Sequence, residues 1–196
     1  TVSMIIIIAV VFSIYVWSEK QMDQANNFRT QSFQLMDELR QSSDDLTRMV
    51  RTYVATGNPI YKKHYQTIID IRNGKMLRPK NYNQVYWGFV LSGETPENID
   101  TTPAVALLDL MKQANFPEQE LQKLADSKAH SDKLTEIEFE AMRLFEESAT
   151  DGKSKAHSML YDDNYHLAKA DIMRPINEVT ALMDQRTSTA VSHAKE

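Results

Sequence analysis

The sequence predicts an all-α protein: an elongated, up-down four-helix bundle with two long terminal helices, the first of them continuous with part of a transmembrane helix. Three observations support this fold. The 196 residues include 5 glycines, 6 prolines and 10 methionines, a composition poor in turn formers and rich in residues that fill helical cores. Residues 18–56 contain no glycine or proline and carry an apolar seam with helical spacing. A second stretch, residues 158–196, has the same length.

The first element is an apolar run from Met4 to Trp17 that contains no charged residue. It ends with Tyr15 and Trp17 before a polar run, as sequences do at a membrane interface. The run is 14 residues long, whereas a membrane span needs about 20. A signal peptide would need a basic stretch before the run and a small-residue cleavage site after it, and a buried core helix would not usually continue into a long polar helix. We interpret residues 1–17 as the outer part of a transmembrane helix and residues 18–196 as the domain outside the membrane.

The next helix is expected over residues 18–56. Its seam has alternating steps of four and three, the heptad pattern that packs helices nearly parallel; it consists of Phe28, Ser32, Leu35, Leu39, Ser42, Leu46, Met49 and Tyr53. Gly57 is expected to end this helix in a left-handed conformation. Asn58 as N-cap and Pro59 at the first position then start a second helix over residues 60–73.

The middle of the chain contains more breakers. Residues 76–103 read as loop, with a helical piece around 84–91, because five prolines and glycines interrupt the pattern: Pro79, Gly88, Gly93, Pro96 and Pro103. Thr102 and Pro103 predict the start of a short helix over 104–114, capped by Asn115. Pro117 opens a longer helix to about residue 147, and residues 148–155 read as a turn. The last helix, from about residue 158, has the seam Ile172, Ile176, Val179, Met183 and Ala190.

The two terminal helices match in length. Residues 18–56 and 158–196 are 39 residues each, so both helices would reach about 58 Å at 1.5 Å per residue. We expect the chain to leave the membrane through the first helix and to return toward it through the last. The two ends should therefore lie side by side, and shorter helices between them should complete the bundle.

Composition argues against several functions. The net charge of −5 offers no basic stripe to a phosphate backbone, so we expect no nucleic-acid partner. The absence of cysteine rules out disulfides, thiolate metal sites and cysteine nucleophiles, and the five histidines are scattered. No Gly-rich phosphate loop, GxSxG or HExxH motif is present. We expect no catalytic residue, no metal, no cofactor and no enzymatic activity in this segment.

The best candidate for a binding site is the segment 70–87, DIRNGKMLRPKNYNQVYW. Guanidinium groups beside aromatic faces on an irregular segment commonly recognise a small anion or a partner protein; the candidate residues are Arg72, Arg78, Tyr82, Tyr86 and Trp87. In the alternative, the aromatic residues close the distal end of the bundle while the basic residues stay in solvent.

Arg48 and Arg51 are further candidates, on the first long helix. An arginine that faces the interior needs a carboxylate partner or binds one from a ligand, whereas on a solvated face it pairs with an Asp or Glu. Pro175 lies inside the last helix and should bend its axis, either as a kink that transmits a signal or as a static bend. Asp162 and His166 share a helix face, which is only a weak indication of a metal site and reads better as a surface pair.

Two stretches of the chain resemble a known family. Residues 38–87, with the segments RTYVATGNP and NYNQVYW, and residues 159–179, MLYDDNYHLAKADIMRPINEV, look like the helical periplasmic sensor modules of bacterial transmembrane receptors. Such modules precede sensor histidine kinases, methyl-accepting chemoreceptors and diguanylate cyclases. The resemblance implies an input domain between two membrane helices, anchored in the bacterial inner membrane with its bulk in the periplasm, and working as a homodimer.

The resemblance leaves the ligand and the output open. The input would be a small-molecule ligand or a periplasmic binding protein. A histidine kinase of a two-component system is the preferred output, followed by a chemoreceptor or a diguanylate cyclase. The rival interpretation is a membrane-anchored helical adaptor that does not signal.

Overall fold

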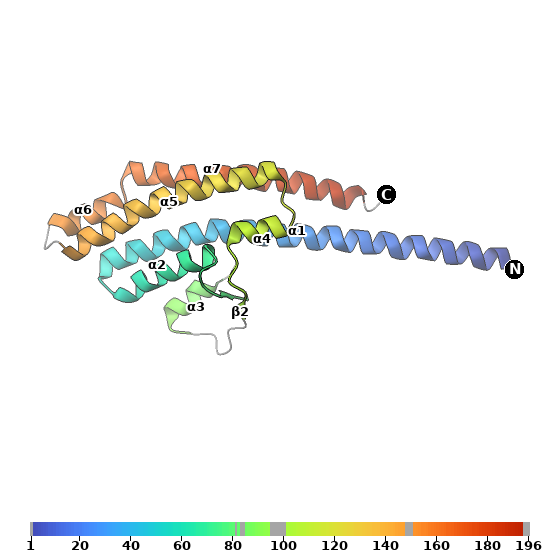
Figure 1. Cartoon of the computed structure of the whole chain (residues 1–196), viewed down its shortest axis with the longest axis horizontal. Coiled ribbons are helices and arrows are strands. Elements are labelled where there is room, and N and C mark those ends of the chain that lie inside the picture. Colours follow the sequence, from blue (N-terminus) through green and yellow to red (C-terminus); the bar gives the residue numbers. More distant parts are fainter. Residues whose placement is uncertain (1, 81, 83–84, 95–100, 148–150, 194–196) are drawn as a thin grey trace.

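The computed structural model describes residues 2–80, 82, 85–94, 101–147 and 151–193, which form an all-α fold with one small sheet (Figure 1). The helices are α1 (Val2–Thr56), α2 (Pro59–Arg72), α3 (Tyr86–Ser92), α4 (Leu107–Gln113), α5 (Glu118–Glu147), α6 (Asp151–Met159) and α7 (Asp163–His193). Strands β1 (Arg78–Pro79) and β2 (Thr101–Thr102) pair antiparallel. The all-α class predicted from the sequence is confirmed.

The N-terminal part of α1 stands clear of the other helices (Figure 1). Its large apolar side chains, from Met4 to Trp17, are between 46% and 67% exposed. Within the described part of the chain, α1 is the one helix long and apolar enough to cross a membrane; its most apolar window has a mean hydropathy of 1.5 and no buried residue. This segment therefore lies outside the hydrophobic core. A signal sequence near an N-terminus meets the same criterion of length and composition.

The remainder of α1 is buried on two faces. Six seam residues are buried as predicted, and Phe28 and Leu35 are half-buried; the six are Ser32, Leu39, Ser42, Leu46, Met49 and Tyr53. A second stripe is also buried because α2 and α4 pack against α1 as well as α5, α6 and α7; it contains Met36, Ser43, Val50 and Val54. On α7 the predicted seam is buried at Ile172, Ile176, Val179 and Met183, while the side chain of Ala190 lies outside the described residues.

The turn between α1 and α2 follows from its residues. Gly57 has φ 69°, the left-handed conformation that glycine adopts without strain, and its backbone N–H donates to the Tyr53 carbonyl at 2.7 Å. Asn58 caps α2 by accepting a hydrogen bond from the Ile60 N–H at 3.1 Å, and Pro59 occupies the first turn. The predicted glycine stop and Asn-Pro start are both confirmed.

The chain leaves the bundle after residue 73 and rejoins it at residue 106, and we call the described residues in between (74–80, 82, 85–94 and 101–105), with Asn73 and Ala106, the side hairpin. A bridge between Asn73 and Ala106 closes its neck, and β1 and β2 pair with Arg78 opposite Thr102. The helical piece expected around 84–91 is α3, although Gln84 lies outside the described residues. The side hairpin lies beside the bundle (Figure 1), so the expectation that its aromatic residues close the distal end is wrong.

Two predicted boundaries are also wrong. The helix expected over 104–114 begins at Leu107, because Thr102 belongs to β2 and its hydroxyl donates to the Arg78 carbonyl at 3.3 Å. The C-cap of α4 is Ala114 and not the predicted Asn115, which follows it in a left-handed conformation with φ 57°. Most of the turn expected over 148–155 is helical, since α6 covers Asp151–Met159, whereas residues 148–150 lie outside the described residues.

The helix α6 forms because small side chains let it pack closely on α5. Gly152 and Ala156, four residues apart, are its buried positions. The reversal lies instead at residues 160–162, and Asp162 caps α7 by accepting a hydrogen bond from the Tyr165 N–H at 2.8 Å. The last helix therefore begins at Asp163 and not at the predicted residue 158.

The neck of the side hairpin yields a prediction. A Cβ at Gly74, which has φ 69°, would lie 2.4 Å from the Ala106 backbone nitrogen. We expect Gly74→Ala to cost about 2 kcal/mol or more in the free energy of unfolding, measured by chemical denaturation. Gly88→Ala is the matched control, because no atom lies within 4 Å of its added Cβ, and it should change stability by no more than about 1 kcal/mol. Equal effects of the two substitutions would contradict the tight neck.

Candidate functional site

The interior of the bundle contains a carboxylate held by two tyrosines. The Tyr65 hydroxyl donates to Oε2 of Glu138 and the Tyr165 hydroxyl to Oε1, both at 2.6 Å. The Tyr165 hydroxyl also lies 3.0 Å from the Thr47 hydroxyl oxygen. One residue each from α1, α2, α5 and α7 meets here, and we call these four the central junction.

Burial dominates the electrostatics of the central junction. Glu138 is 1% exposed, and burial raises the pKa of its carboxyl, while the two tyrosine hydroxyls and the positive charges of Lys169 and Arg72 oppose this shift. Burial also raises the pKa of both Tyr65 and Tyr165, which therefore remain neutral hydrogen-bond donors. The junction is thus a buried acid whose charge depends on donors from neighbouring helices.

A second buried pair joins α1 to the side hairpin. Nη1 of Arg78 lies 3.0 Å from both carboxylate oxygens of Glu38, and each side chain is 8% exposed. Nη2 of Arg78 donates to the Val105 carbonyl, in the segment between β2 and α4. Burial raises the pKa of Glu38 to about 7, although the Arg78 charge acts in the opposite direction. We call Glu38 and Arg78 the side junction.

The aromatic residues of the predicted binding segment form one cluster, which includes the first two residues of α3. Nε1 of Trp87 donates to the Tyr82 hydroxyl at 3.1 Å, and the rings of Tyr86 and Trp87 lie 5.2 Å apart. Trp87 also contacts His64 of α2, with ring centroids 5.1 Å apart. Tyr82 and Trp87 are buried and Tyr86 is half-buried, so this cluster attaches α3 to the bundle.

The two predicted arginines of this segment are buried as well. Arg72 is 4% exposed and Arg78 is 7% exposed, so the alternative in which both stay in solvent is wrong. Nη1 of Arg72 donates to the Ser131 hydroxyl at 2.8 Å. The structure therefore brings Arg78, Tyr82, Tyr86 and Trp87 together in the side hairpin and directs Arg72 toward α5. Their role in binding a ligand stays a prediction.

Arg48 and Arg51 have different surroundings. Arg48 is on the surface and pairs with Asp45 at 2.6 Å. Arg51 is half-buried, and its Nε and Nη2 donate to the Leu160 carbonyl at 3.0 and 2.7 Å. Its guanidinium also lies 4.3 Å from the centre of the Tyr161 ring. Arg51 thus fixes the turn between α6 and α7 without a carboxylate partner.

Contacts between α1 and α7 form a ladder of polar pairs. Arg29 pairs with Asp184 at 2.6 Å, and Lys169 pairs with Asp44 at 3.1 Å and donates to the Ser43 carbonyl at 3.0 Å. The residue numbers of the partners add up to 213 for Arg29–Asp184 and Asp44–Lys169 and to 212 for Thr47–Tyr165. A nearly constant sum means that the two antiparallel helices keep one register.

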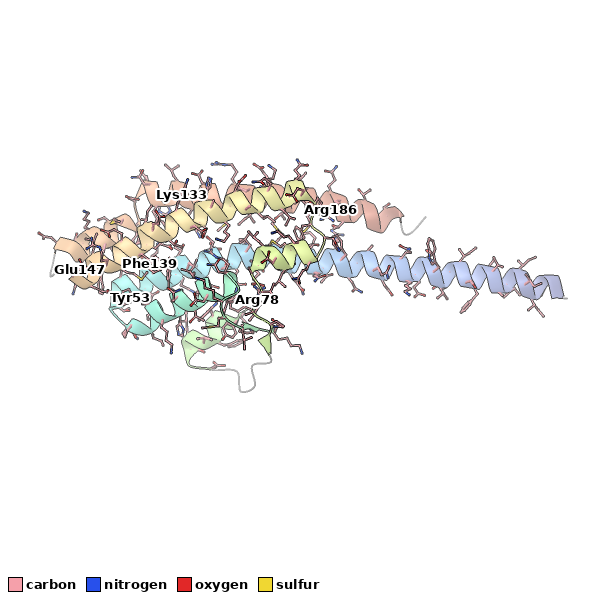
Figure 2. All side chains as sticks on the ribbon, in the orientation of Figure 1. Tyr53, Arg78, Lys133, Phe139, Glu147 and Arg186 are labelled. Carbon is pink, nitrogen blue, oxygen red and sulfur yellow. The ribbon has the colours of Figure 1, made fainter. Side chains whose placement is uncertain are left out.

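The ladder places the end of α7 near the apolar segment of α1. At the same register, His193 lies level with about residue 20, three residues after Trp17. Arg186 fastens this end, because its guanidinium makes two hydrogen bonds of 3.1 Å to Glu120 of α5 and lies 5.0 Å from the centre of the Phe28 ring. Figure 2 shows Arg186 at this end of the bundle, Arg78 beside α1, and Tyr53 and Glu147 at the opposite end.

Pro175 lies inside α7, which continues through it from Asp163 to His193. The Ser127 hydroxyl of α5 donates to the Ile172 carbonyl at 2.9 Å, next to the Asp171 carbonyl that the missing proline N–H leaves without its helical hydrogen bond. The bend expected at Pro175, and its use in signalling, stay predictions.

No group of three or more His, Cys, Asp and Glu side chains is placed to hold a metal ion among the residues that the structure describes. Asp162, considered with His166 as a possible ligand pair, acts as the α7 cap. Comparison of the chain with protein-family models, curated proteins and solved structures found no significant match.

Sequence reasoning missed Glu38, Asp45 and Glu138. A signal for Glu138 exists, since it follows Leu134 by four residues and precedes Ala141 by three, which places it in the apolar seam of α5. Glu38 and Asp45 are seven residues apart on one face of α1 and are both 6% exposed. An acidic residue at a seam position was the available indication for Glu138, whereas Glu38 and Asp45 each lie one residue before a seam position of α1.

The central junction leads to a stability prediction. Tyr165→Phe removes a donor from the buried Glu138 carboxylate, so it should cost about 1–3 kcal/mol in the free energy of unfolding. The loss should be larger at pH 8 than at pH 5, because the Tyr165 hydroxyl stabilises the charged form of Glu138 more than the neutral form, and the charged form gains population as pH rises. Denaturation at both pH values measures this. Tyr161→Phe, at a 43% exposed ring, is the control and should stay within about 0.5 kcal/mol.

Proposed function

We propose that this chain is the extracytoplasmic, membrane-anchored input domain of a bacterial transmembrane signalling receptor. In this proposal α1, α2, α5 and α7 form an up-down four-helix bundle, and the apolar part of α1 crosses the inner membrane. A histidine kinase of a two-component system is the preferred output, with a chemoreceptor or a diguanylate cyclase as alternatives. The segment itself has no enzymatic role, and it works as a homodimer in the periplasm.

The observation that carries the proposal is the arrangement of α1 and α7. One unbroken helix runs from the exposed apolar run into the core, and the ladder keeps α7 antiparallel to it until His193 lies level with about residue 20. A helix that ends beside a membrane-spanning helix is suited to carry a displacement to the membrane. A simple adaptor would need no such paired ends.

The buried junctions suggest how a displacement is transmitted. The hydrogen bonds of 2.6 Å from Tyr65 and Tyr165 to the buried Glu138 cannot survive a shift of one helical turn, about 5.4 Å. The helices therefore favour discrete arrangements over continuous sliding. A ligand or partner protein drives the change only if it binds one arrangement more tightly than the other.

The membrane topology can be tested with single cysteines, because the native chain has none. Ser154→Cys at the far end of the bundle and Ser188→Cys near the end of α7 are both at exposed positions. In intact bacterial cells that produce the chain, we expect a membrane-impermeant maleimide to label both. Removal of residues 2–17 should release the protein from the membrane fraction. Labelling of either cysteine only after cell lysis would contradict the proposed location.

Signalling can be tested in a chimera that joins residues 1–193 to the second membrane span and output domain of a characterised bacterial histidine kinase. Arg29→Cys and Asp184→Cys, at a ladder pair, would be bridged with a short bis-maleimide. We expect the bridge to fix the register and to change the reporter output several-fold. The two single-cysteine variants, treated identically, are the controls. An output that the bridge leaves unchanged would favour the adaptor.

A further inference from the structure

A groove of about 340 Å³ opens along the contact between α1 and α7, and we call it the α1–α7 groove. Its eight lining residues, four from each helix, all belong to the part of the chain that the structure describes. The groove lies between two pairs of the ladder, Arg29–Asp184 and Asp44–Lys169. It is therefore an open stretch within the contact that joins the two terminal helices.

The lining residues follow the register of the ladder, in which the residue numbers of partners add up to 213. They form four pairs with this same sum: Phe33 with Thr180, Met36 with Asn177, Asp37 with Ile176, and Arg40 with Met173. Every pair sets an apolar side chain opposite a polar or charged one.

This mismatch explains why the contact stays open. An apolar side chain gains by leaving water when another apolar group covers it, and a polar or charged group opposite cannot do so without losing its own hydration. Met36 and Ile176 nevertheless reach the core, at 2% and 4% exposure, while Phe33 and Met173 are half-buried. The α1–α7 groove is therefore a chiefly apolar hollow with a polar rim.

The charges at the rim are already paired within α1. Arg40 donates to Asp37 at 2.7 Å and to Asp44 at 3.2 Å. Asn177 of α7, in contrast, is exposed, and its side-chain amide forms no hydrogen bond with the residues that the structure describes. The groove thus offers apolar walls and a free amide, while its charged groups satisfy one another.

We propose that the α1–α7 groove binds an uncharged amphipathic small molecule. Its apolar body lies against Met36 and Ile176, and its carbonyl, hydroxyl or amide group bonds to the Asn177 amide. The volume is in the range of small-molecule sites, which are mostly apolar with a few polar groups that orient the ligand. A charged ligand is disfavoured, because its charge would lose hydration without meeting a free opposite charge. Methionines on both walls, Met36 and Met173, adapt their flexible side chains to the ligand.

The site deepens the proposed function, because a ligand there acts on both terminal helices. It contacts both walls only while α1 and α7 keep the present register, since a shift of one helical turn, about 5.4 Å, carries Asn177 away from Met36. Binding therefore favours this register over a shifted one, which is the differential affinity that a signalling ligand needs. This consequence rests on the proposed function, whereas the binding itself does not.

Binding can be measured on the full chain in micelles of an uncharged detergent, by NMR of methionine methyl groups labelled with ¹³C. Three probes share a six-carbon tail and differ in the head: hexanamide is uncharged, hexanoate is an anion and hexylammonium is a cation. We expect hexanamide to shift the signals of Met36 and Met173, with a dissociation constant on the order of 1 mM for so small a ligand. The two charged probes should bind at least about ten times more weakly.

The other methionines are internal controls, and each signal is assigned by a Met→Leu substitution. Met111 and Met142, which are buried elsewhere in the core, should not respond to hexanamide. Met4, in the exposed apolar run, reports how much probe the micelle takes up.

Substitutions at Asn177 test the assignment. Asn177→Leu sets an apolar side chain opposite Met36, which fills the groove and removes the free amide, so the shifts of Met36 and Met173 should disappear. Asn177→Asp keeps the shape of the side chain and introduces a charge, so it should reverse the preference from hexanamide to hexylammonium. Gln185→Leu, at another exposed position of α7, is the matched control and should bind hexanamide as the wild type does. Unchanged signals of Met111 show that a variant has folded.

Three results would overturn the site. In the first, Met36 and Met173 do not respond to about 20 mM hexanamide, well above the expected dissociation constant. In the second, their shifts persist in Asn177→Leu or are produced equally by hexanoate. In the third, both signals move with protein concentration in the absence of probe, which would assign the groove to a second copy of the chain.

Failure of the site and failure of the proposed function are distinguishable, because binding requires neither a membrane span nor an output domain. Hexanamide that binds but leaves the reporter of the histidine kinase chimera unchanged would contradict the signalling role while the site stands. A chimera that responds to the bridge between Arg29→Cys and Asp184→Cys, although none of the probes binds the groove, would give the reverse result.

Discussion

The structure depends on the burial of α1 along its length. Past the apolar run, α1 is enclosed by α5 and α7 on one side and by α2, α4 and the side hairpin on the other, so both of its faces belong to the core. Buried polar groups on such a helix are stabilised when they find a hydrogen-bond partner on a neighbour. Glu38, Ser43 and Thr47 do so with Arg78, Lys169 and Tyr165. These partners fix the register of α1 more strictly than apolar packing alone, because hydrogen bonds tolerate little displacement.

The parts of the fold that were predicted from the sequence are those determined by residues close together in the chain. The seam of α1 repeats over many turns, and the Gly57, Asn58 and Pro59 turn needs only its own backbone. The pairing of Arg78 with Thr102 was not predictable in this way, because it joins two short segments with no alternating pattern. The helix over Asp151–Met159 was missed because its local sequence indicates a turn, while a contact with a distant helix stabilises it. Its small residues read as turn formers, whereas contact with α5 makes Gly152 favourable in a helix.

The candidate site was predicted in part. Residue type and spacing identified the segment that contains Arg78, Tyr82 and Trp87, but they could not show that these side chains would find their partners within the chain. The acidic partners were overlooked because a charged residue on a helix is usually solvated. Glu138 is an exception that its seam position on α5 reveals. Glu38 lies outside the predicted seam of α1, and its burial follows only from the second buried face of that helix.

The two junctions differ in what they allow to move. Glu138 is held by donors from α2 and α7, and the donor from α7, Tyr165, also contacts Thr47 of α1, so release of Glu138 would require several helices to separate together. Glu38 is paired with Arg78 of the side hairpin, whose Tyr82 and Trp87 are buried in the core, so breaking this pair alone does not free the hairpin. The central junction therefore joins four helices, while the side junction joins α1 to the side hairpin. Since Glu38 belongs to the same continuous helix as Trp17, a change at the side hairpin acts directly on the helix that leads to the apolar run, with no intermediate element to absorb it.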